Sequence, residues 1–187
     1  MSVPQSVMTA LGEVQIAPAT LEEIPAVLAL FDESVAWLAE KGLTGQWGTT
    51  PFSQLPRMRE RLVGWVERRT LFVARLAGEV VGVLSVGPEV PPYAVAEWEA
   101  RPATAYYLEA FTTRRRVEGK GLGGALLRWA EGYTGAHGID WLRLDCWADN
   151  PGLVGYYRRQ GYTPVGEVNL GTWRGQLMEK RLGGVEG

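Results

Sequence analysis

Apolar residues recur every three or four positions in several long stretches of the chain, the spacing of a helix that buries one face. This spacing predicts helices over 20–40, 53–66, 122–137 and 150–160. Between the helices lie shorter runs rich in aromatic and branched residues, which are typical of strands. We expect strands over 13–17, 71–76, 79–86, 105–113, 141–147, 165–169 and 173–181. Strands that alternate with helices and also form hairpins indicate a mixed sheet covered by helices.

The composition is that of a soluble globular protein. The 187 residues are 46% hydrophobic and carry a formal net charge of -2, and the mean hydropathy is -0.08. We therefore expect one domain over residues 1–187, with residues 1–12 as a flexible tail. No apolar run approaches the roughly 18 residues of a membrane span. The charge balance does not favour nucleic acid as a partner.

Two singular residues restrict the chemistry further. Cys146 is the one cysteine, so an internal disulfide is excluded and a reducing, cytoplasmic location is expected. His137 is the one histidine and follows a predicted helix, where its charge suits the helix dipole better than catalysis. With so few nitrogen and sulfur ligands, we expect no metal site.

A glycine-rich turn separates the strand over 105–113 from the helix after it. Residues 119–124 read Gly-Lys-Gly-Leu-Gly-Gly. Glycine lets the backbone approach a ligand closely, and a helix start offers N–H groups and a positive dipole end to a phosphate. A turn that only reverses the chain is less favoured, since glycine costs about 0.8–1.0 kcal/mol per helical position relative to alanine. The turn therefore predicts a phosphate site.

Two common phosphate motifs fit this turn poorly. Gly119, Gly121 and Gly124 satisfy the dinucleotide pattern, but residues 112–118 separate them from the strand. The Walker pattern fails because Lys120 is followed by glycine instead of serine or threonine. NAD and ATP therefore become minor alternatives.

The turn instead resembles the acyl-CoA pyrophosphate loop of the GCN5-related N-acetyltransferase (GNAT) family, which has the form Q/R-x-x-G-x-G/A. Alignment on Gly121 and Gly123 places Glu118 where the family has Gln or Arg. An offset alignment that begins at Arg116 satisfies the pattern but fits the helix start less well. We prefer the first alignment because backbone N–H groups make most of the phosphate contact.

A second segment strengthens the resemblance. Residues 150–162 match the family's N-x6-Y-x3-G-F/Y motif, with Asn150, Tyr157 and Gly161 in register. In the family the asparagine lies near the CoA arm and the tyrosine near its sulfur. A tyrosine-rich helix can also pack its face on a sheet, and we favour that role for Tyr156.

The resemblance implies a fold and an activity. The expected fold is α/β (α+β), a mixed and mostly antiparallel sheet of six to seven strands flanked by about four helices. The expected reaction is transfer of an acetyl group from acetyl-CoA to a primary amine of a small molecule or peptide by direct attack. A non-catalytic acyl-CoA-binding module is the alternative, and the register of Asn150 and Tyr157 favours the enzyme. The oligomeric state stays open, with a homodimer among the alternatives.

The resemblance also assigns the donor site. The strand before the turn would separate from the next one and lend backbone hydrogen bonds to the pantetheine arm, and one N–H would polarise the thioester carbonyl. Arg115, Arg116 or Lys120 would reach a phosphate as point charges, although an exposed, solvated position is the default interpretation for each. The cofactor-binding residues expected in this way are Phe111, Thr112, Thr113, Gly119, Lys120, Gly121, Leu122, Gly123, Gly124 and Asn150.

The chemistry needs a base and a stabilised leaving group. A lysine-like amine has a pKa near 10.4, so its neutral form costs about 4.6 kcal/mol at pH 7. Glu109 is the first candidate base because it lies two residues before Phe111, and an ordinary strand-edge carboxylate is an equally weighted interpretation. Tyr157 would stabilise the departing thiolate by a hydrogen bond, because the pKa of tyrosine, about 10, exceeds the thiol's 8.5.

The acceptor is only weakly indicated. In the family its pocket is built from early helices and variable loops, here 42–52 and the proline-rich 87–102. Aromatic and acidic residues in these loops would suit a cationic amine, although core tryptophans and solvated glutamates are the simpler explanation. These residues are Trp47, Glu97, Trp98 and Glu99.

Overall fold

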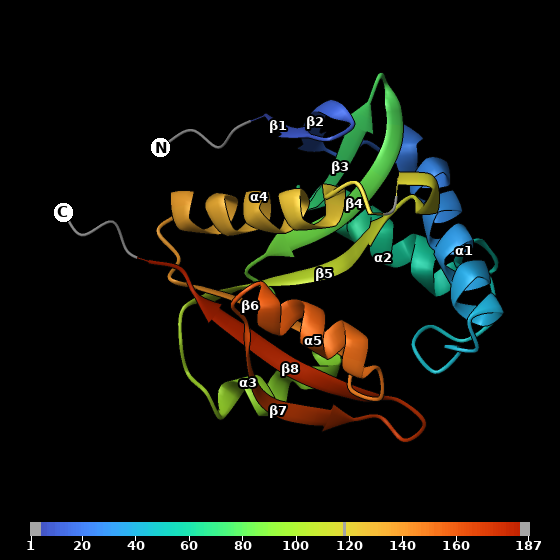
Figure 1. The fold of residues 1–187 in the computed structure, drawn as a ribbon. Coiled ribbons are helices and arrows are strands. Elements are labelled where there is room, and N and C mark those ends of the chain that lie inside the picture. The colour runs from blue at the N-terminus through green and yellow to red at the C-terminus, as the bar shows by residue number, and fades with distance from the viewer. Residues whose placement is uncertain (1–4, 118, 184–187) are drawn as a thin grey trace.

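The computed structural model describes residues 5–117 and 119–183. An eight-stranded sheet forms its centre, in the spatial order β1-β2-β3-β4-β5-β6-β8-β7 (Figure 1). Every neighbouring pair is antiparallel except β5 and β6, which are parallel. The strands are β1 Ser6–Thr9, β2 Gly12–Pro18, β3 Leu71–Leu76, β4 Glu79–Gly87, β5 Ala105–Thr113, β6 Trp141–Trp147, β7 Thr163–Asn169 and β8 Arg174–Arg181.

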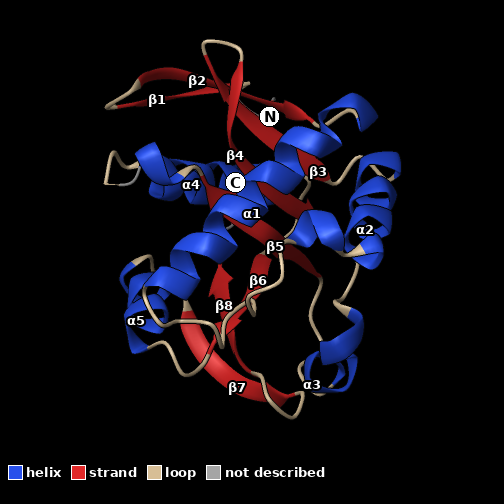
Figure 2. Ribbon diagram, turned by 90° about the vertical axis from the view of Figure 1, so that its right-hand side faces the viewer, coloured by secondary structure: helices blue, strands red, loops and turns tan. Residues whose placement is uncertain are grey.

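Helices cover both faces of the sheet. The α-helices of the described residues are α1 Ile24–Glu40, α2 Pro56–Glu67, α3 Val95–Glu99, α4 Leu122–Ala136 and α5 Pro151–Arg159. Figures 1 and 2 show α4 and α5 on one face, with α1 and α2 on the other. The sheet is therefore buried on both sides over its central strands.

Alternation along the strands fills two separate cores. In β3, Phe72 and Ala74 enter the core under α4 and α5, while Leu71 and Val73 enter the core under α1 and α2. Successive side chains of a strand point to opposite faces, so a continuous apolar run serves both layers. A third, smaller core beneath α3 contains Trp98.

The expected α/β fold with a mixed, mostly antiparallel sheet is confirmed, and two details differ. The sheet has eight strands in place of six to seven, and a fifth helix, α3, lies inside the segment expected to be irregular. Four prolines in the segment 87–102 obscure the helical pattern, and α3 is only five residues long. So short a helix leaves little periodicity in the sequence.

The expected flexible tail over 1–12 is wrong for its second half. Ser6–Thr9 forms β1, which pairs with β2 and turns Val7 toward the core. A four-residue strand with one exposed methionine, Met8, gives too short an alternation to recognise in a sequence. Residues 1–4 lie outside the described residues.

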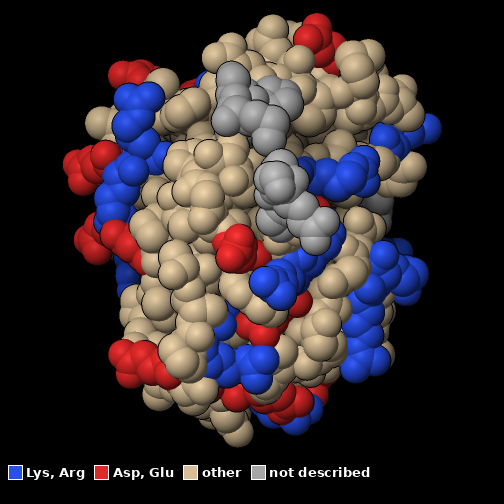
Figure 3. Space-filling model, turned by 90° about the vertical axis from the view of Figure 1, so that its left-hand side faces the viewer, with Lys and Arg blue, Asp and Glu red and all other residues tan. Residues whose placement is uncertain are grey.

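The surface carries no dominant charge on the face that Figure 3 shows. Basic and acidic side chains are interspersed there, in keeping with the net charge of -2. Among the described residues, no helix combines the length and the apolar character needed to cross a bilayer.

Candidate functional site

The two parallel strands at the centre of the sheet separate along their length. β5 and β6 are paired from Ala105 opposite Trp141 to Leu108 opposite Leu144. Beyond these pairs each strand continues without the other, β5 to Thr113 and β6 to Trp147. The separation between β5 and β6 that the GNAT resemblance implies is therefore present, and two cavities border it.

A β-bulge lies on β5 where the strands separate. Glu109 is paired with Ser85 and Thr112 with Val83 on β4, so the two residues between them face one residue of β4. One of these two, Ala110, has a φ of 52°. A left-handed conformation costs a non-glycine residue about 1–3 kcal/mol, and such strain is concentrated at functional sites. Nothing in the sequence signals this bulge, because alanine is not a residue that marks one.

One cavity, of about 750 Å³, lies against the glycine-rich turn, and we call it the glycine-turn cavity. The turn residues Gly119 and Gly121 have φ values of 73° and 78°, which only glycine adopts without strain. Gly121 is the N-cap of α4, so no side chain caps the first N–H groups of the helix. Of the expected cofactor-binding residues, the cavity is lined by Phe111, Thr112, Thr113, Gly119, Gly121, Leu122, Gly123, Gly124 and Asn150.

Helix α1 holds this turn against the end of β5. The Ser34 and Thr112 hydroxyls are 2.8 Å apart and buried. The Glu33 carboxylate accepts a hydrogen bond of 2.6 Å from the Arg115 backbone N–H and one of 3.2 Å from the Arg114 guanidinium. These bonds fix the chain just before the turn, so the turn's N–H groups are presented from a rigid support.

The basic residues around the turn have different surroundings. Arg115 lines the glycine-turn cavity, lies over the Trp37 ring at 4.9 Å and donates to the Thr113 carbonyl at 3.1 Å. Arg116 forms an exposed ion pair with Glu79. Lys120 is exposed and lies outside the cavity lining. Arg115 is therefore the basic residue best placed to face an anion in this cavity, while Glu118 lies outside the described residues.

Helix α5 carries both residues of the second motif. Asn150 is its N-cap, and the Asn150 Oδ1 accepts a hydrogen bond of 3.1 Å from the Leu153 N–H. Tyr157 is buried and lines both cavities. Burial raises the pKa of the Tyr157 phenol well above its ordinary value, so the hydroxyl is a neutral hydrogen-bond donor at pH 7. Tyr156 packs beside it, with ring centroids 5.2 Å apart.

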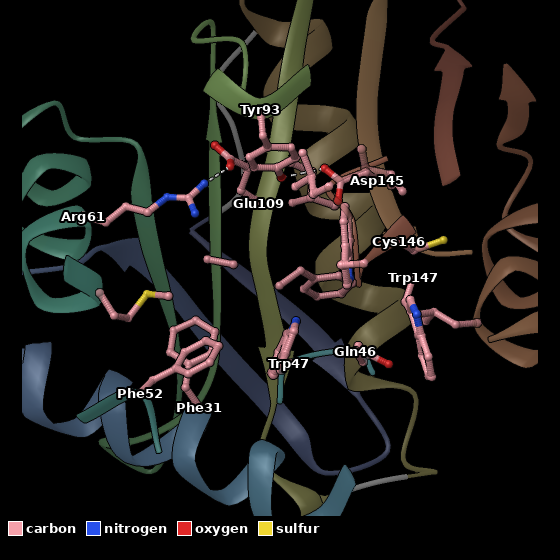
Figure 4. Close-up of a pocket in the computed structure, with 18 of the residues that line it drawn as sticks. Phe31, Gln46, Trp47, Phe52, Arg61, Tyr93, Glu109, Asp145, Cys146 and Trp147 are labelled. Carbon is pink, nitrogen blue, oxygen red and sulfur yellow. Dashed lines mark hydrogen bonds and ion pairs between the residues drawn. The ribbon is translucent and has the colours of Figure 1, made fainter. Parts of the chain in front are cut away.

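The other cavity, of about 470 Å³, lies across the separated strands on the side of α2, and we call it the carboxylate cavity. Figure 4 shows Glu109 from β5 and Asp145 from β6 pointing into it. Glu109 forms an ion pair with Arg61 of α2. Asp145 accepts a hydrogen bond of 2.8 Å from the Tyr93 hydroxyl.

The Glu109 carboxyl has the electrostatics of a base that works near neutral pH. Its side chain is 11% exposed. Burial raises the pKa of Glu109 to about 7; the Arg61 charge lowers this pKa, and the Asp145 charge raises it. Burial also raises the pKa of Asp145, while the Tyr93 hydrogen bond and the Arg61 charge lower it. A buried carboxyl of this kind is typical of sites that move protons.

Sequence reasoning missed most of the carboxylate cavity. Arg61, Tyr93 and Asp145 come from a helix, a proline-rich segment and a strand that are far apart in the chain. The one local signal is Asp145, an acidic residue inside the otherwise apolar run Leu144 to Cys146. An acid in such a run needs a partner or a function.

The expected acceptor residues are only partly in place. Trp47 lines the carboxylate cavity, but Trp98 is 2% exposed and packs on Tyr107 in the small core, with ring centroids 5.9 Å apart. Glu97 and Glu99 lie outside the cavity lining. The simpler explanation therefore holds for Trp98, which lies in a core, and none of these three α3 residues lines the cavity.

The one histidine and the one cysteine of the chain both lie in positions that suit a structural role. The His137 Nδ1 lies 2.8 Å from the Tyr133 carbonyl oxygen at the end of α4. Cys146 is buried, and burial raises the pKa of its thiol to about 12. No group of three histidine, cysteine or acidic residues in 5–117 and 119–183 is arranged to hold a metal ion.

Comparison with known proteins agrees with this geometry. Residues 32–162 match the model of the acetyltransferase (GNAT) family. The chain belongs to the GNAT family. A Bacillus subtilis relative, the uncharacterized N-acetyltransferase YesJ, is 31% identical over an alignment of 175 residues that covers 88% of this chain and 88% of that chain.

Solved structures of GNAT proteins share the fold. A GNAT acetyltransferase from Listeria monocytogenes superposes with a TM-score of 0.75 and 21% identity, over 95% of this chain and 99% of that chain. The PaiA N-acetyltransferase from Thermoplasma acidophilum, solved in complex with coenzyme A, gives a TM-score of 0.66 and 17% identity over 90% and 98% of the two chains.

Proposed function

We propose that this GNAT protein transfers an acetyl group from acetyl-CoA to a primary amine of a small molecule or peptide by direct attack. The observation that carries the proposal is that the glycine-turn cavity and the carboxylate cavity meet. The residues that line both are Gln46, Trp47, Phe111, Leu153 and Tyr157. A thioester reaching this junction from one side would meet an amine arriving from the other.

The glycine-turn cavity would hold acetyl-CoA, which supplies the acetyl group as an activated thioester. The N–H groups at the start of α4 would bind the pyrophosphate, because a helix N-terminus attracts anions. Arg115 and Asn150 would lie along the same molecule. The complex of the PaiA protein with coenzyme A supports this choice of ligand.

The carboxylate cavity would hold the amine. Glu109 accepts a proton from the ammonium group, and the neutral amine attacks the thioester carbonyl. A C–N bond forms, the C–S bond breaks, and the electron pair leaves on the CoA sulfur. The second proton, which the nitrogen loses as the amide forms, finally protonates this sulfur, so CoA leaves as the free thiol. Tyr157 donates a hydrogen bond to this thiolate. Because burial raises the pKa of Tyr157 further, hydrogen bonding is favoured over complete proton transfer.

Ligand-induced stabilisation tests the donor assignment. We expect acetyl-CoA to raise the unfolding temperature, since a ligand at 100 times its Kd stabilises a protein by about 2.7 kcal/mol. NAD and ATP, at equal concentration, should leave it unchanged. A shift with NAD and none with acetyl-CoA would overturn the proposal.

Turnover tests the reaction itself. Release of free thiol from acetyl-CoA should depend on an added primary amine, and mass spectrometry should find the acetylated amine. Stabilisation by acetyl-CoA without turnover of any small amine or peptide would instead favour the non-catalytic acyl-CoA-binding module.

A further inference from the structure

The carboxylate cavity has two contrasting ends. Figure 4 shows Glu109 and Asp145 at one end, near Tyr93, and the rings of Phe31, Phe52 and Trp47 toward the other. These two ends are complementary to a molecule that has a charged group at one end and a ring at the other.

The apolar end is a cluster of three aromatic rings. Phe31 of α1, Trp47 of the loop after α1 and Phe52 before α2 have ring centroids 5.3–5.7 Å apart, and their planes are inclined to one another. Phe31 and Phe52 are buried in the core and Trp47 is half-buried, so the cluster is a firmly packed aromatic wall of the cavity. Another aromatic ring gains more from packing on such rings than a flexible chain does.

The charged end carries a carboxylate without a cationic partner. The cationic side chains in the cavity lining are Arg57 and Arg61 of α2; Arg61 is paired with Glu109, and Arg57 is exposed. Within the described residues Asp145 forms no ion pair, and its hydrogen-bond donor is the neutral Tyr93 hydroxyl. Burying a charge without a partner costs free energy, because the charge loses its hydration. An ammonium group beside Asp145 would offset this desolvation cost of the carboxylate.

The size of the cavity and its aromatic walls favour a small molecule over a peptide. Its volume of about 470 Å³ is within the usual range of small-molecule sites, roughly 300–1,000 Å³. The rings of Tyr93 and Trp173, 6.2 Å apart, add a further aromatic wall near the carboxylates. A peptide backbone needs hydrogen-bond partners that ring walls do not supply.

We propose that the acceptor is a primary alkylamine that carries an aromatic ring, with its ammonium group between Glu109 and Asp145 and its ring against Phe31, Trp47 and Phe52. This inference rests on the proposed acetyltransferase function and names its substrate class. Asp145 is then a specificity-determining residue that holds the cation, while Glu109 removes the proton. The raised pKa values of both carboxyls agree with a cavity that is completed by a cation.

A panel of three amines tests the substrate class. Phenethylamine, n-hexylamine and a tripeptide with a free N-terminus are compared by thiol release at equal acetyl-CoA. We expect kcat/KM for phenethylamine to exceed that of n-hexylamine by at least tenfold and that of the tripeptide by more. Equal values for the two small amines, or preference for the tripeptide, would overturn the substrate class.

Asp145→Asn tests the charged end, with Asp149→Asn as the matched control. Asp149 is exposed, pairs with Arg174 and lies outside both cavities. Asp145→Asn should raise the KM for phenethylamine about tenfold and leave the acetyl-CoA affinity unchanged, whereas the control should change neither. An unchanged KM in Asp145→Asn removes Asp145 from acceptor recognition.

A binding measurement separates this inference from the proposed function. Quenching of tryptophan fluorescence by phenethylamine, without acetyl-CoA, should saturate at an amine concentration about tenfold lower for the native protein than for Asp145→Asn. If acetyl-CoA binds and n-hexylamine is acetylated as well as phenethylamine, the acetyltransferase proposal stands and the aromatic acceptor falls. If acetyl-CoA does not bind while phenethylamine saturates the quenching, the donor proposal falls and the amine site stands.

Discussion

The two cavities present different groups to a ligand. The glycine-turn cavity offers backbone N–H groups at the start of a helix, in a turn whose shape depends on the left-handed Gly119 and Gly121. The carboxylate cavity is lined by ionisable and aromatic residues, among them Glu109, Asp145 and Trp47. Backbone recognition tolerates sequence change around it, whereas each side chain of the second cavity can be exchanged separately. A family can therefore keep one donor site while its acceptor sites vary.

Among variants that separate the two cavities, we expect Glu109→Gln to have the largest effect on the reaction rate. Loss of a general base costs about 10²–10⁴-fold in rate, so kcat/KM should fall by that range while the Kd for acetyl-CoA stays within twofold. Steady-state kinetics and calorimetry measure the two quantities. Glu99→Gln, an exposed residue on α3, is the control and should resemble the native protein. A fall of less than fivefold in Glu109→Gln would remove Glu109 as the base.

Tyr157→Phe probes the junction where the cavities meet. Without the hydroxyl the departing thiolate loses a hydrogen bond of about 1.5–2 kcal/mol, so kcat should fall about 10–30-fold. The ring is retained, so the packing against Tyr162, at 5.9 Å between ring centroids, should keep the fold and the acetyl-CoA affinity. Weakened binding with unchanged kcat would contradict the role of Tyr157 toward the leaving group.

Gly121→Ala acts on the donor side alone. A Cβ at a φ of 78° strains the N-cap of α4 by about 1–2 kcal/mol. We expect about a tenfold rise in the Kd for acetyl-CoA and an unchanged KM for the amine. Gly132→Ala is the control inside the same helix: its added Cβ meets open space, and it should stabilise the protein by up to about 1 kcal/mol. If both variants bind acetyl-CoA equally, the turn is not a phosphate site.

The smallest expected effect is a shift in the pH dependence of the reaction when a charged residue of the carboxylate cavity is replaced. Glu109 must be deprotonated to act as a base, so kcat/KM, which reports the free enzyme, should rise with pH through an apparent pKa of about 7. The Arg61 charge lowers this pKa and the Asp145 charge raises it. Arg61→Gln should therefore move the rising limb to higher pH, and Asp145→Asn should move it to lower pH, each by up to about one pH unit. Shifts in the same direction would contradict the assignment of the limb to Glu109.

The sequence predicted the elements of the fold wherever they were long or strongly patterned. The helix over 20–40 is observed as a short 3-10 turn followed by α1, and the strand over 105–113 as β5 with the same bounds. The structure adds β1 and α3, which are four and five residues long. Elements this short do not complete enough periods to be recognised, and contacts with distant residues stabilise them.

In the candidate site, too, the features that depend on neighbouring residues could be predicted, and those that depend on distant residues could not. The glycine turn and the Asn150–Tyr157 register are local patterns, because each lies within one turn or one helix. Such patterns are visible in a sequence, since neighbouring residues alone produce the geometry. Glu109 was suggested by its place on β5, but its pKa depends on Arg61 and Asp145, which only the fold brings near.

The sequence by itself determined the family fold and the glycine-rich turn at the start of α4, because turns, helix caps and strand alternation are governed by residues close together in the chain. The tertiary structure alone decided the carboxylate cavity. It placed Arg61 and Asp145 around Glu109, brought Trp47 against Phe31 and Phe52, and turned Trp98 away into a core. The physical reason is that a cavity lined by side chains depends on long-range packing, which no local pattern in the sequence records.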